Sequence, residues 1–397
     1  METDRSFFDS IPHQIILNIF LKLQLRCVLR LKSVCKAWYV LIHNDFTDVY
    51  FKLSKENTFG IGIGISTGPH ALDYGSKTMI PYEISSLQIG GGIKTLMIKN
   101  ISAIVGRLSV RYSINGLIFL SDDDDFYVCN PSTGEFVTLP RFIHHPCPDT
   151  VTVMKRRIYE TGFGYSPLRN QYKVIIIFQD FCENKSVSKV KVAVITVASS
   201  SNSWRIIDDF PQYKYRDGQG TVCLNGIIYL LGFCDHRTHL VKVLAFDVAD
   251  ETVRKITPRP EIYDYKTLPN LSELEGKLCL IDFNDLDDEK SFEIYMMEDH
   301  QWESRYTFFS KDFKLDFDYF LYYTQYQCLR NGKLIIWSEL IDGRLFCYIK
   351  SKTFETIEVA DSNFSISLFP CEESLASKCS MNDILTANCL EVEANVP

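Results

Sequence analysis

Cys234, His236 and His239 bring three side chains of metal-ligand type together within six residues. This spacing could place two or three ligands on one ion, but a zinc site usually takes four, and no second cluster of comparable quality stands out. Segment 144–147, with two histidines and a cysteine, lies elsewhere in the chain. We therefore expect no metal site, and we interpret His236, Arg237 and His239 as an exposed polar loop that could contact a protein partner.

Two further groups of residues have the composition of ligand sites without their spacing. The acidic run from Asp122 to Asp125 lacks the alternating ligands and the glycine turn of a calcium loop, so we expect a solvated hairpin tip there. The glycines at 60, 62 and 64 lack the third glycine of a dinucleotide-binding loop, because Ile65 occupies its place. No hydrolase or metalloprotease motif occurs, so the sequence predicts neither a cofactor nor a catalytic site.

Tyrosines gather in two segments between predicted strands, at Tyr263 and Tyr265 and at Tyr322 and Tyr323. Tyrosine is favoured at protein interfaces, because it supplies a large contact area and a polar tip at little cost in side-chain entropy. These four residues are therefore candidates for contact with a partner. Ordinary packing within the strands is the alternative interpretation.

The composition is that of a globular protein with many aromatic residues. The chain has 397 residues, of which 46% are hydrophobic and 13% aromatic, values that favour β-strands over a helical bundle. The formal net charge of −8 gives no attraction for nucleic acid or anionic lipid, and no apolar stretch approaches the roughly 20 residues of a membrane-spanning helix. Thirteen scattered cysteines without a Cys-x-x-Cys pair are typical of reduced thiols, so we expect the cytoplasm, the nucleus or both.

The first 55 residues have helical periodicity. A first helix is predicted by one broad apolar stripe made of Ile15, Ile16, Ile19, Phe20 and Leu23. The apolar segments 27–34 and 36–43 predict two more short helices. Three such helices cannot hide this much apolar surface from one another, so we expect part of it to face a partner, with packing on the rest of the chain as the alternative.

From about residue 58 onward, short strands separated by turn residues replace the helical pattern. An Asn-Gly or Glu-Gly pair followed by an apolar strand recurs, with its glycine at 116, 226, 276 and 332, and a degenerate copy lies at 172–178. Each copy begins a small antiparallel meander, and a repeat of such meanders every 50 residues or so is typical of propeller blades. Six blades are predicted, over 58–100, 110–140, 165–211, 220–260, 270–308 and 325–360.

Two sets of motifs resemble a known family. Ile11-Pro12, the helical stripe and Val34-Cys35-Lys36-Ala37-Trp38 resemble an F-box over residues 8–50. The remainder resembles the F-box-associated domain of plant F-box proteins, a kelch-like β-propeller. The motifs found in that family's order are Asn115-Gly116-Leu117-Ile118, Asn130-Pro131-Ser132-Thr133-Gly134-Glu135-Phe136, Gly162-Phe163-Gly164-Tyr165 and Ser203-Trp204-Arg205.

The resemblance implies a non-catalytic substrate-recognition subunit of an SCF-type ubiquitin ligase. The F-box would dock on a Skp-family adaptor, and through it on cullin and RING subunits, while the propeller would bind the protein to be ubiquitylated. The implied adaptor-binding residues are Ile11, Pro12, Ile15, Ile16, Ile19, Phe20, Leu23, Leu31, Val34, Cys35 and Trp38. Two alternatives stay open, a propeller interaction protein that acts outside any ligase and a propeller enzyme with the helices as a cap.

These observations divide the chain into an F-box domain at 5–53, a mainly β propeller domain at 58–371 and a flexible tail at 372–397. Residues 1–56 carry eight basic and six acidic side chains, so the remaining residues carry a net charge of −10. The acidity therefore belongs to the propeller and tail, which favours a substrate with a basic surface.

Overall fold

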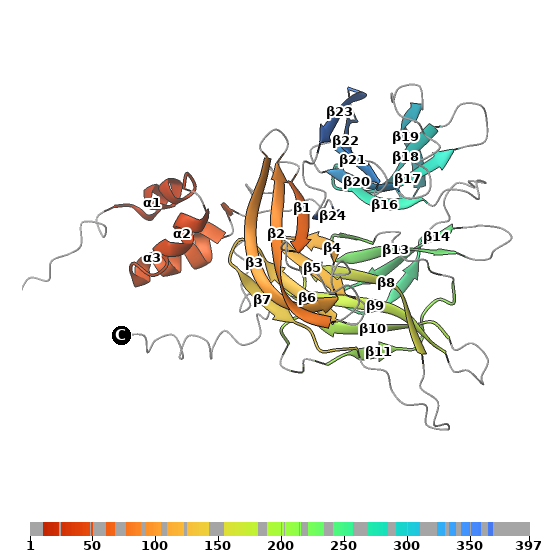
Figure 1. Cartoon of the computed structure of the whole chain (residues 1–397), viewed down its shortest axis with the longest axis horizontal. Helices are drawn as coiled ribbons and strands as arrows, with labels where there is room; N and C mark the ends of the chain where they lie inside the picture. The colour runs from red at the N-terminus through yellow and green to blue at the C-terminus, as the bar shows by residue number, and fades with distance from the viewer. Residues whose placement is uncertain are drawn as a thin grey trace, which may run out of the picture.

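The protein is described by a computed structural model. It describes residues 11–23, 25–47, 49–50, 61–67, 77–88, 92–104, 109–122, 125–142, 155–181, 189–199, 201, 203–213, 215, 221–233, 241–256, 269–284, 291–299, 301–309, 324–329, 333–338, 343–349, 351–358 and 364–367. The fold is mainly β, with a few N-terminal helices beside the sheets (Figure 1).

The helices form a small module at the N-terminus. They are α1 (His13–Phe20), α2 (Leu25–Leu31), α3 (Lys36–Leu41) and the π-helical segment η2 (Ile42–Phe46). The three predicted helices are confirmed, although each is shorter than its apolar segment, and η2 was not predicted. Pro12 precedes α1 as its N-cap, a position at which a missing N–H breaks no hydrogen bond. None of the helices in the described segments is long and apolar enough to span a bilayer.

The β-strands form six four-stranded antiparallel sheets. Five sheets are consecutive in the chain: β4 (Ser109–Ile114), β5 (Leu117–Asp122), β6 (Asp125–Asn130) and β7 (Glu135–Thr138); β8 (Lys155–Ser166), β9 (Gln171–Phe181), β10 (Lys191–Thr196) and β11 (Arg205–Ile207); β12 (Val222–Leu224), β13 (Ile227–Phe233), β14 (Val241–Asp247) and β15 (Val253–Lys255); β16 (Asn270–Leu274), β17 (Lys277–Asn284), β18 (Ser291–Glu298) and β19 (Gln301–Phe309); β20 (Thr324–Leu329), β21 (Lys333–Ser338), β22 (Gly343–Tyr348) and β23 (Thr353–Glu358). The sheets follow one another in chain order around the body (Figure 1), which confirms the predicted propeller with six blades.

The sixth sheet joins two distant parts of the chain. It contains β1 (Ile61–Thr67), β2 (Lys77–Gln88), β3 (Gly92–Ile104) and β24 (Phe364–Ser367). Strand β24 pairs with β1, with Gly64 opposite Ile366. The sequence predicted this blade from 58–100 alone and did not predict its fourth strand. The blade predicted at 165–211 also differs from the prediction, because it begins at Lys155 with β8.

The repeated turn motif links the first and second strands of a blade. Asn115 and Gly116 have φ of 52° and 77°, Asn225 and Gly226 have 52° and 82°, and Glu275 and Gly276 have 53° and 74°. Two consecutive residues with positive φ define the type I′ turn that suits a two-residue β-hairpin. The recurring sequence therefore marks the turn of the first hairpin in these three blades, and the first strand of each blade precedes that turn.

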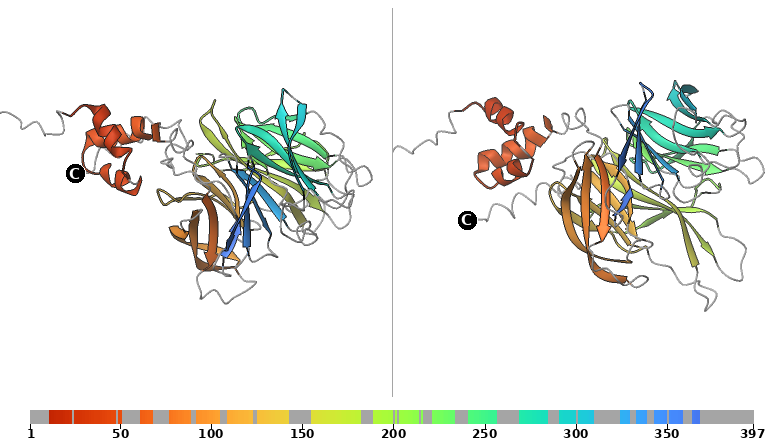
Figure 2. Two further views of the ribbon diagram at one scale, coloured as in Figure 1. Left: turned by 90° about the horizontal axis from the view of Figure 1, so that it is seen from above. Right: turned by 45° about the horizontal axis from the view of Figure 1, so that its top comes forward.

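The first strands of the blades lie next to one another in the middle of the body. Contacts join β4 with β8, β8 with β12, β12 with β16, β16 with β20, and β24 with β4. The additional views show the same arrangement of the blades (Figure 2). Between the blades lie apolar cores, for example the one formed by Phe119, Phe126, Phe163 and Phe178 between β4–β7 and β8–β11. Burial of such rings on the faces of adjacent sheets holds the blades together.

Candidate interaction surfaces

The first helix carries apolar side chains on two sides. Ile16, Leu17 and Phe20 are buried in the module core, whereas Ile15 and Ile19, which lie one turn apart, are 50% and 51% exposed. Residues four positions apart share one face of a helix. The predicted stripe is therefore divided, with one part folding the module and the other part facing solvent.

The module core explains several of the predicted site residues. Phe20 contacts the Trp38 ring edge-on, with ring centroids 5.2 Å apart, and meets Phe46 of η2 at 6.5 Å. Ile11 and Leu31 are half-buried and pack against the same core. The sequence indicated these apolar positions correctly but not which of them would fold the module. Ile16 and Phe20 in particular are buried and are not available at its surface.

The exposed apolar side chains are concentrated in this module. Seven large hydrophobic residues are exposed among those whose burial is described, and five of them belong to the helices and their turns: Ile15, Ile19, Leu23, Val34 and Val40. We call these five residues the exposed apolar set. Pro12 and Cys35, two other predicted adaptor-binding residues, are also exposed. Val40, on α3, was not among the predicted site residues, although it is apolar and lies in a predicted helix.

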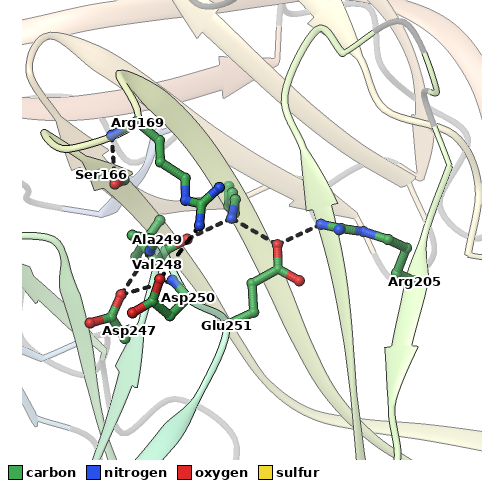
Figure 3. Close-up of polar contacts among 9 residues, drawn as sticks. Ser166, Arg169, Arg205, Asp247, Val248, Ala249, Asp250 and Glu251 are labelled. Carbon is green, nitrogen blue, oxygen red and sulfur yellow. Dashed lines mark hydrogen bonds and ion pairs between the residues drawn. The ribbon is translucent and has the colours of Figure 1, made fainter.

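Adjacent blades of the propeller are joined by an ion-pair network (Figure 3). Lys173 on β9 donates to the Val248 carbonyl oxygen at 2.6 Å and to Glu251 Oε1 at 2.7 Å, and Arg205 on β11 reaches the same carboxylate at 2.6 Å. Arg169 lies 3.5 Å from Asp250 in the same turn. The Lys173 side chain is only 4% exposed, and the Glu251 carboxylate supplies the opposite charge that a buried cation needs.

The charge state of Glu251 follows from the same contacts. Partial burial opposes its negative charge, but the hydrogen bonds and positive charges of Lys173 and Arg205 outweigh that effect, and the pKa of Glu251 lies below its ordinary value. Its backbone has φ of 57°, within the tight turn between β14 and β15. The turn thus presents a carboxylate that is charged at neutral pH to the preceding blade.

The tryptophan of the Ser203-Trp204-Arg205 motif connects a second pair of blades. Trp204 Nε1 donates to the Pro140 carbonyl oxygen at 2.7 Å, and the Trp204 ring lies against Phe126 and Phe142, with centroids 5.7 and 5.4 Å away. Two adjacent residues of this motif therefore contact different blades. Trp204 contacts the preceding blade, and Arg205 contacts the following blade. The motif is explained by packing between blades.

The acidic run lies differently from the prediction. Asp122 and Asp125 are 0% and 6% exposed and face each other across β5 and β6, and Arg141 Nε lies 2.9 Å from Asp125 Oδ1. Burial, together with these two carboxylates, raises the pKa of Tyr127 to about 12. The predicted solvated tip is wrong for Asp122 and Asp125, because the strands continue up to them.

All of the residues predicted to contact a substrate lie outside the described residues. They are His236, Arg237, His239, Tyr263, Tyr265, Tyr322 and Tyr323. Their role stays a prediction. Cys234, segment 144–147 and the tail at 372–397 are also outside. Within the described segments, no group of three or more His, Cys, Asp or Glu side chains is placed to hold a metal ion.

Comparison with known proteins accounts for both parts of the chain. Residues 8–53 match the family model described as F-box-like, and residues 95–380 match the model of the F-box associated beta propeller domain. The second match covers most of the chain. The chain belongs to this family of plant F-box proteins.

Members of this family from Arabidopsis thaliana are similar over most of their length. F-box protein At1g30790 is 26% identical over 308 residues, which cover 74% of this chain and 73% of the relative. Putative F-box protein At3g23960 is 27% identical over 317 residues, with coverage of 74% and 73%. In this F-box protein the helical module is the F-box and the six sheets form the associated propeller. No enzyme family is indicated by either match, and the kelch-like character of the repeat stays a prediction.

Proposed function

We propose that this protein is the substrate-recognition subunit of an SCF-type ubiquitin ligase. The observation that carries this proposal is the exposed apolar set on a module that matches the F-box. Exposed apolar residues scattered singly are normal, but five within 26 residues form a concentration that a binding partner would cover. A Skp-family adaptor is the partner that an F-box implies.

Docking would use the side of α1 that the module core leaves open. Ile15 and Ile19 would enter an apolar groove of the adaptor, with Leu23, Val34 and Val40 supplying further contacts. Burial of apolar surface contributes about 25 cal/mol per Å², so an interface of about 1,600 Å² has the driving force for stable association even after ordering costs are subtracted. The adaptor would then connect the protein to the cullin and RING subunits, in the cytoplasm or the nucleus.

The propeller would hold the protein to be ubiquitylated. Its blades are fixed to one another by buried aromatic cores and by the Lys173–Glu251–Arg205 network, so it suits a rigid platform. The protein itself would carry out no bond chemistry. It would raise the effective concentration of a substrate lysine near a ubiquitin-loaded enzyme held by other subunits.

Retention of a purified Skp-family adaptor on the immobilised full chain tests this proposal. The double variant Ile15→Asp/Ile19→Asp places two charges in the proposed interface at exposed positions and should reduce retention at least about tenfold. The matched control is Leu168→Asp, because Leu168 is 83% exposed on the propeller and should tolerate the same substitution without effect. Equal retention by the double variant and the parent chain would refute adaptor docking through α1.

The same assay separates the alternatives. Capture of the adaptor together with cullin supports the ligase role. Capture of the adaptor without cullin, in the presence of both, indicates an interaction protein that acts outside a ligase. Failure of the parent chain to bind any Skp-family adaptor would favour the helices as a cap on a propeller of another function.

A further inference from the structure

One outer strand of the propeller is longer than the others. Strand β3 has 13 residues, whereas the outer strands β7, β11, β15, β19 and β23 of the other blades have 4, 3, 3, 9 and 6. Strand β3 ends the sheet order β24-β1-β2-β3, so among the described strands none pairs with its second edge (Figure 1). A propeller usually leaves only short edges, because a long row of unpaired N–H and C=O groups is a template for another strand.

The composition of β3 favours pairing with another strand. The strand contains no proline, and more than half of its residues are apolar: Ile93, Leu96, Met97, Ile98, Ile101, Ala103 and Ile104. Its first edge is paired with β2 along the whole strand, from Gly92 opposite Gln88 to Ile104 opposite Lys77. A segment that is already extended, apolar and free of proline is a suitable template for strand addition.

The charges of β3 indicate which kind of strand would pair with it. Lys94 and Lys99 are its charged residues, and its sequence contains no Asp or Glu. The register places Lys94 opposite Ser86 and Lys99 opposite Tyr82, across an irregularity in the pairing. Because Ser86 and Tyr82 lie four residues apart on β2, the two lysines belong to one face of the sheet. Like charges on paired strands are destabilising and opposite charges are stabilising, so β3 disfavours a basic strand and favours an acidic one.

We propose that the second edge of β3 binds an extended segment of another protein in which apolar residues alternate with Asp or Glu. Main-chain hydrogen bonds to β3 would hold the segment as a fifth strand of the sheet, and its carboxylates would lie on the face of Lys94 and Lys99. Edge lysines protect a sheet against strands of the same charge. They would therefore disfavour a second copy of this chain, whose net charge of −8 adds a further repulsion. The proposal concerns the propeller and does not rest on adaptor docking.

Binding of short peptides to the full chain, followed by fluorescence anisotropy, tests the proposal. The acidic probe is fluorescein-labelled VEVEVEV-amide, for which we expect a dissociation constant on the order of 100 µM at low salt. The basic probe, VKVKVKV-amide with the same label, should bind at least about tenfold more weakly. The acidic probe with proline at its third and fourth positions should also bind at least about tenfold more weakly, because proline cannot donate to the hydrogen-bond ladder.

Charge reversal on β3 locates the binding site. Lys94→Glu/Lys99→Glu should weaken the acidic probe at least about tenfold and should strengthen the basic probe, because attractive pairs become repulsive and repulsive pairs become attractive. The matched control is Lys189→Glu/Lys255→Glu, which makes the same change in net charge at two exposed lysines outside this sheet. It should leave both affinities within about twofold of the parent values. Thermal unfolding checks that each variant is folded.

Three results would overturn the proposal. The acidic probe does not bind the parent chain at about 1 mM, or the two charge-reversed variants bind it equally well. In the third, sedimentation shows that the parent chain forms a dimer that Lys94→Glu/Lys99→Glu abolishes, because a second copy then occupies the edge. None of these results affects adaptor retention by the helical module, so the two proposals can fail separately.

Discussion

Ile15 and Ile16 are neighbours in α1, yet Ile15 is 50% exposed while Ile16 is 6% exposed and lies in the core of the F-box. One helical turn therefore contains a residue free to contact a partner next to a residue that folds the module. Folding and docking can be separated experimentally at these two positions.

Substitution of the two isoleucines should affect stability very differently. Ile16→Ala removes buried methyl groups and should lower the free energy of unfolding of the helical module by about 2–5 kcal/mol, whereas Ile15→Ala should change it by less than about 0.5 kcal/mol. Urea denaturation followed by the far-ultraviolet helical signal measures both values. Similar losses for the two variants would mean that α1 does not have the orientation described.

Removal of the Glu251 carboxylate should weaken the contact between two blades. Glu251→Gln replaces the carboxylate beside the nearly buried Lys173 with a neutral amide, so the ammonium group loses its paired negative charge and the propeller should be destabilised by about 2–4 kcal/mol. The control is Asp250→Asn in the same turn, since Asp250 and Arg169 are both more than half exposed and 3.5 Å apart. That change should cost less than about 1 kcal/mol in the same denaturation experiment.

The contribution of Glu251 should depend on pH. Because its pKa is lower in the folded than in the unfolded protein, the stabilisation is complete above the ordinary glutamate pKa of about 4.3 and is lost as the pH falls through the lower folded value. The difference in thermal midpoint between the parent chain and Glu251→Gln should therefore be constant near neutrality and shrink below about pH 4.3. A difference that does not change with pH would contradict this assignment.

Gly164 should not tolerate a side chain. An added Cβ would lie 2.7 Å from Val248 Cγ2 and 2.8 Å from Ile228 Cδ1, so Gly164→Ala should destabilise the propeller by about 1–3 kcal/mol. Gly134, with φ of 78° and no atom within 4 Å of an added Cβ, provides the comparison. Gly134→Asn should cost less than about 1 kcal/mol, because asparagine tolerates positive φ. Thermal unfolding of the two variants distinguishes the two expectations.

Deletion of the closing strand should be more harmful than deletion of the tail. A chain that ends at residue 360 lacks β24 and leaves one edge of β1 unpaired, so its thermal midpoint should fall by at least about 5 °C and it should aggregate with rising concentration. A chain that ends at residue 371 retains β24 and should behave like the parent in light scattering. Equal behaviour of the two truncated chains would show that the pairing of β24 with β1 does not stabilise the propeller.

The sequence allowed prediction of the elements that have strong local signals. Asn115-Gly116 and Asn225-Gly226 marked their hairpins because a type I′ turn requires positive φ at both residues. The first strand of the 155–207 blade was missed because it begins Lys155-Arg156-Arg157, which gives no apolar pattern. Strand β24 has four residues, and its partner β1 is remote in the chain, so pairing alone defines it.

The candidate interaction surfaces were less predictable. Periodicity showed that Ile15, Ile16, Ile19 and Phe20 belong to one helix, but which of them are buried depends on how α1 packs against α3 and η2. The network centred on Glu251 likewise joins residues 46 and 78 positions apart.

The position of β24 also affects how the protein forms during synthesis. Strand β1 leaves the ribosome about 300 residues before its partner, which at about 5–20 residues per second is a delay of roughly 15–60 s. During that interval β1 presents an unpaired edge, a surface that chaperones or other strands can bind. A chain that is released before residue 364 lacks β24, so its ring of blades stays open and the edge of β1 stays exposed. Such unfinished chains should be degraded faster than complete ones.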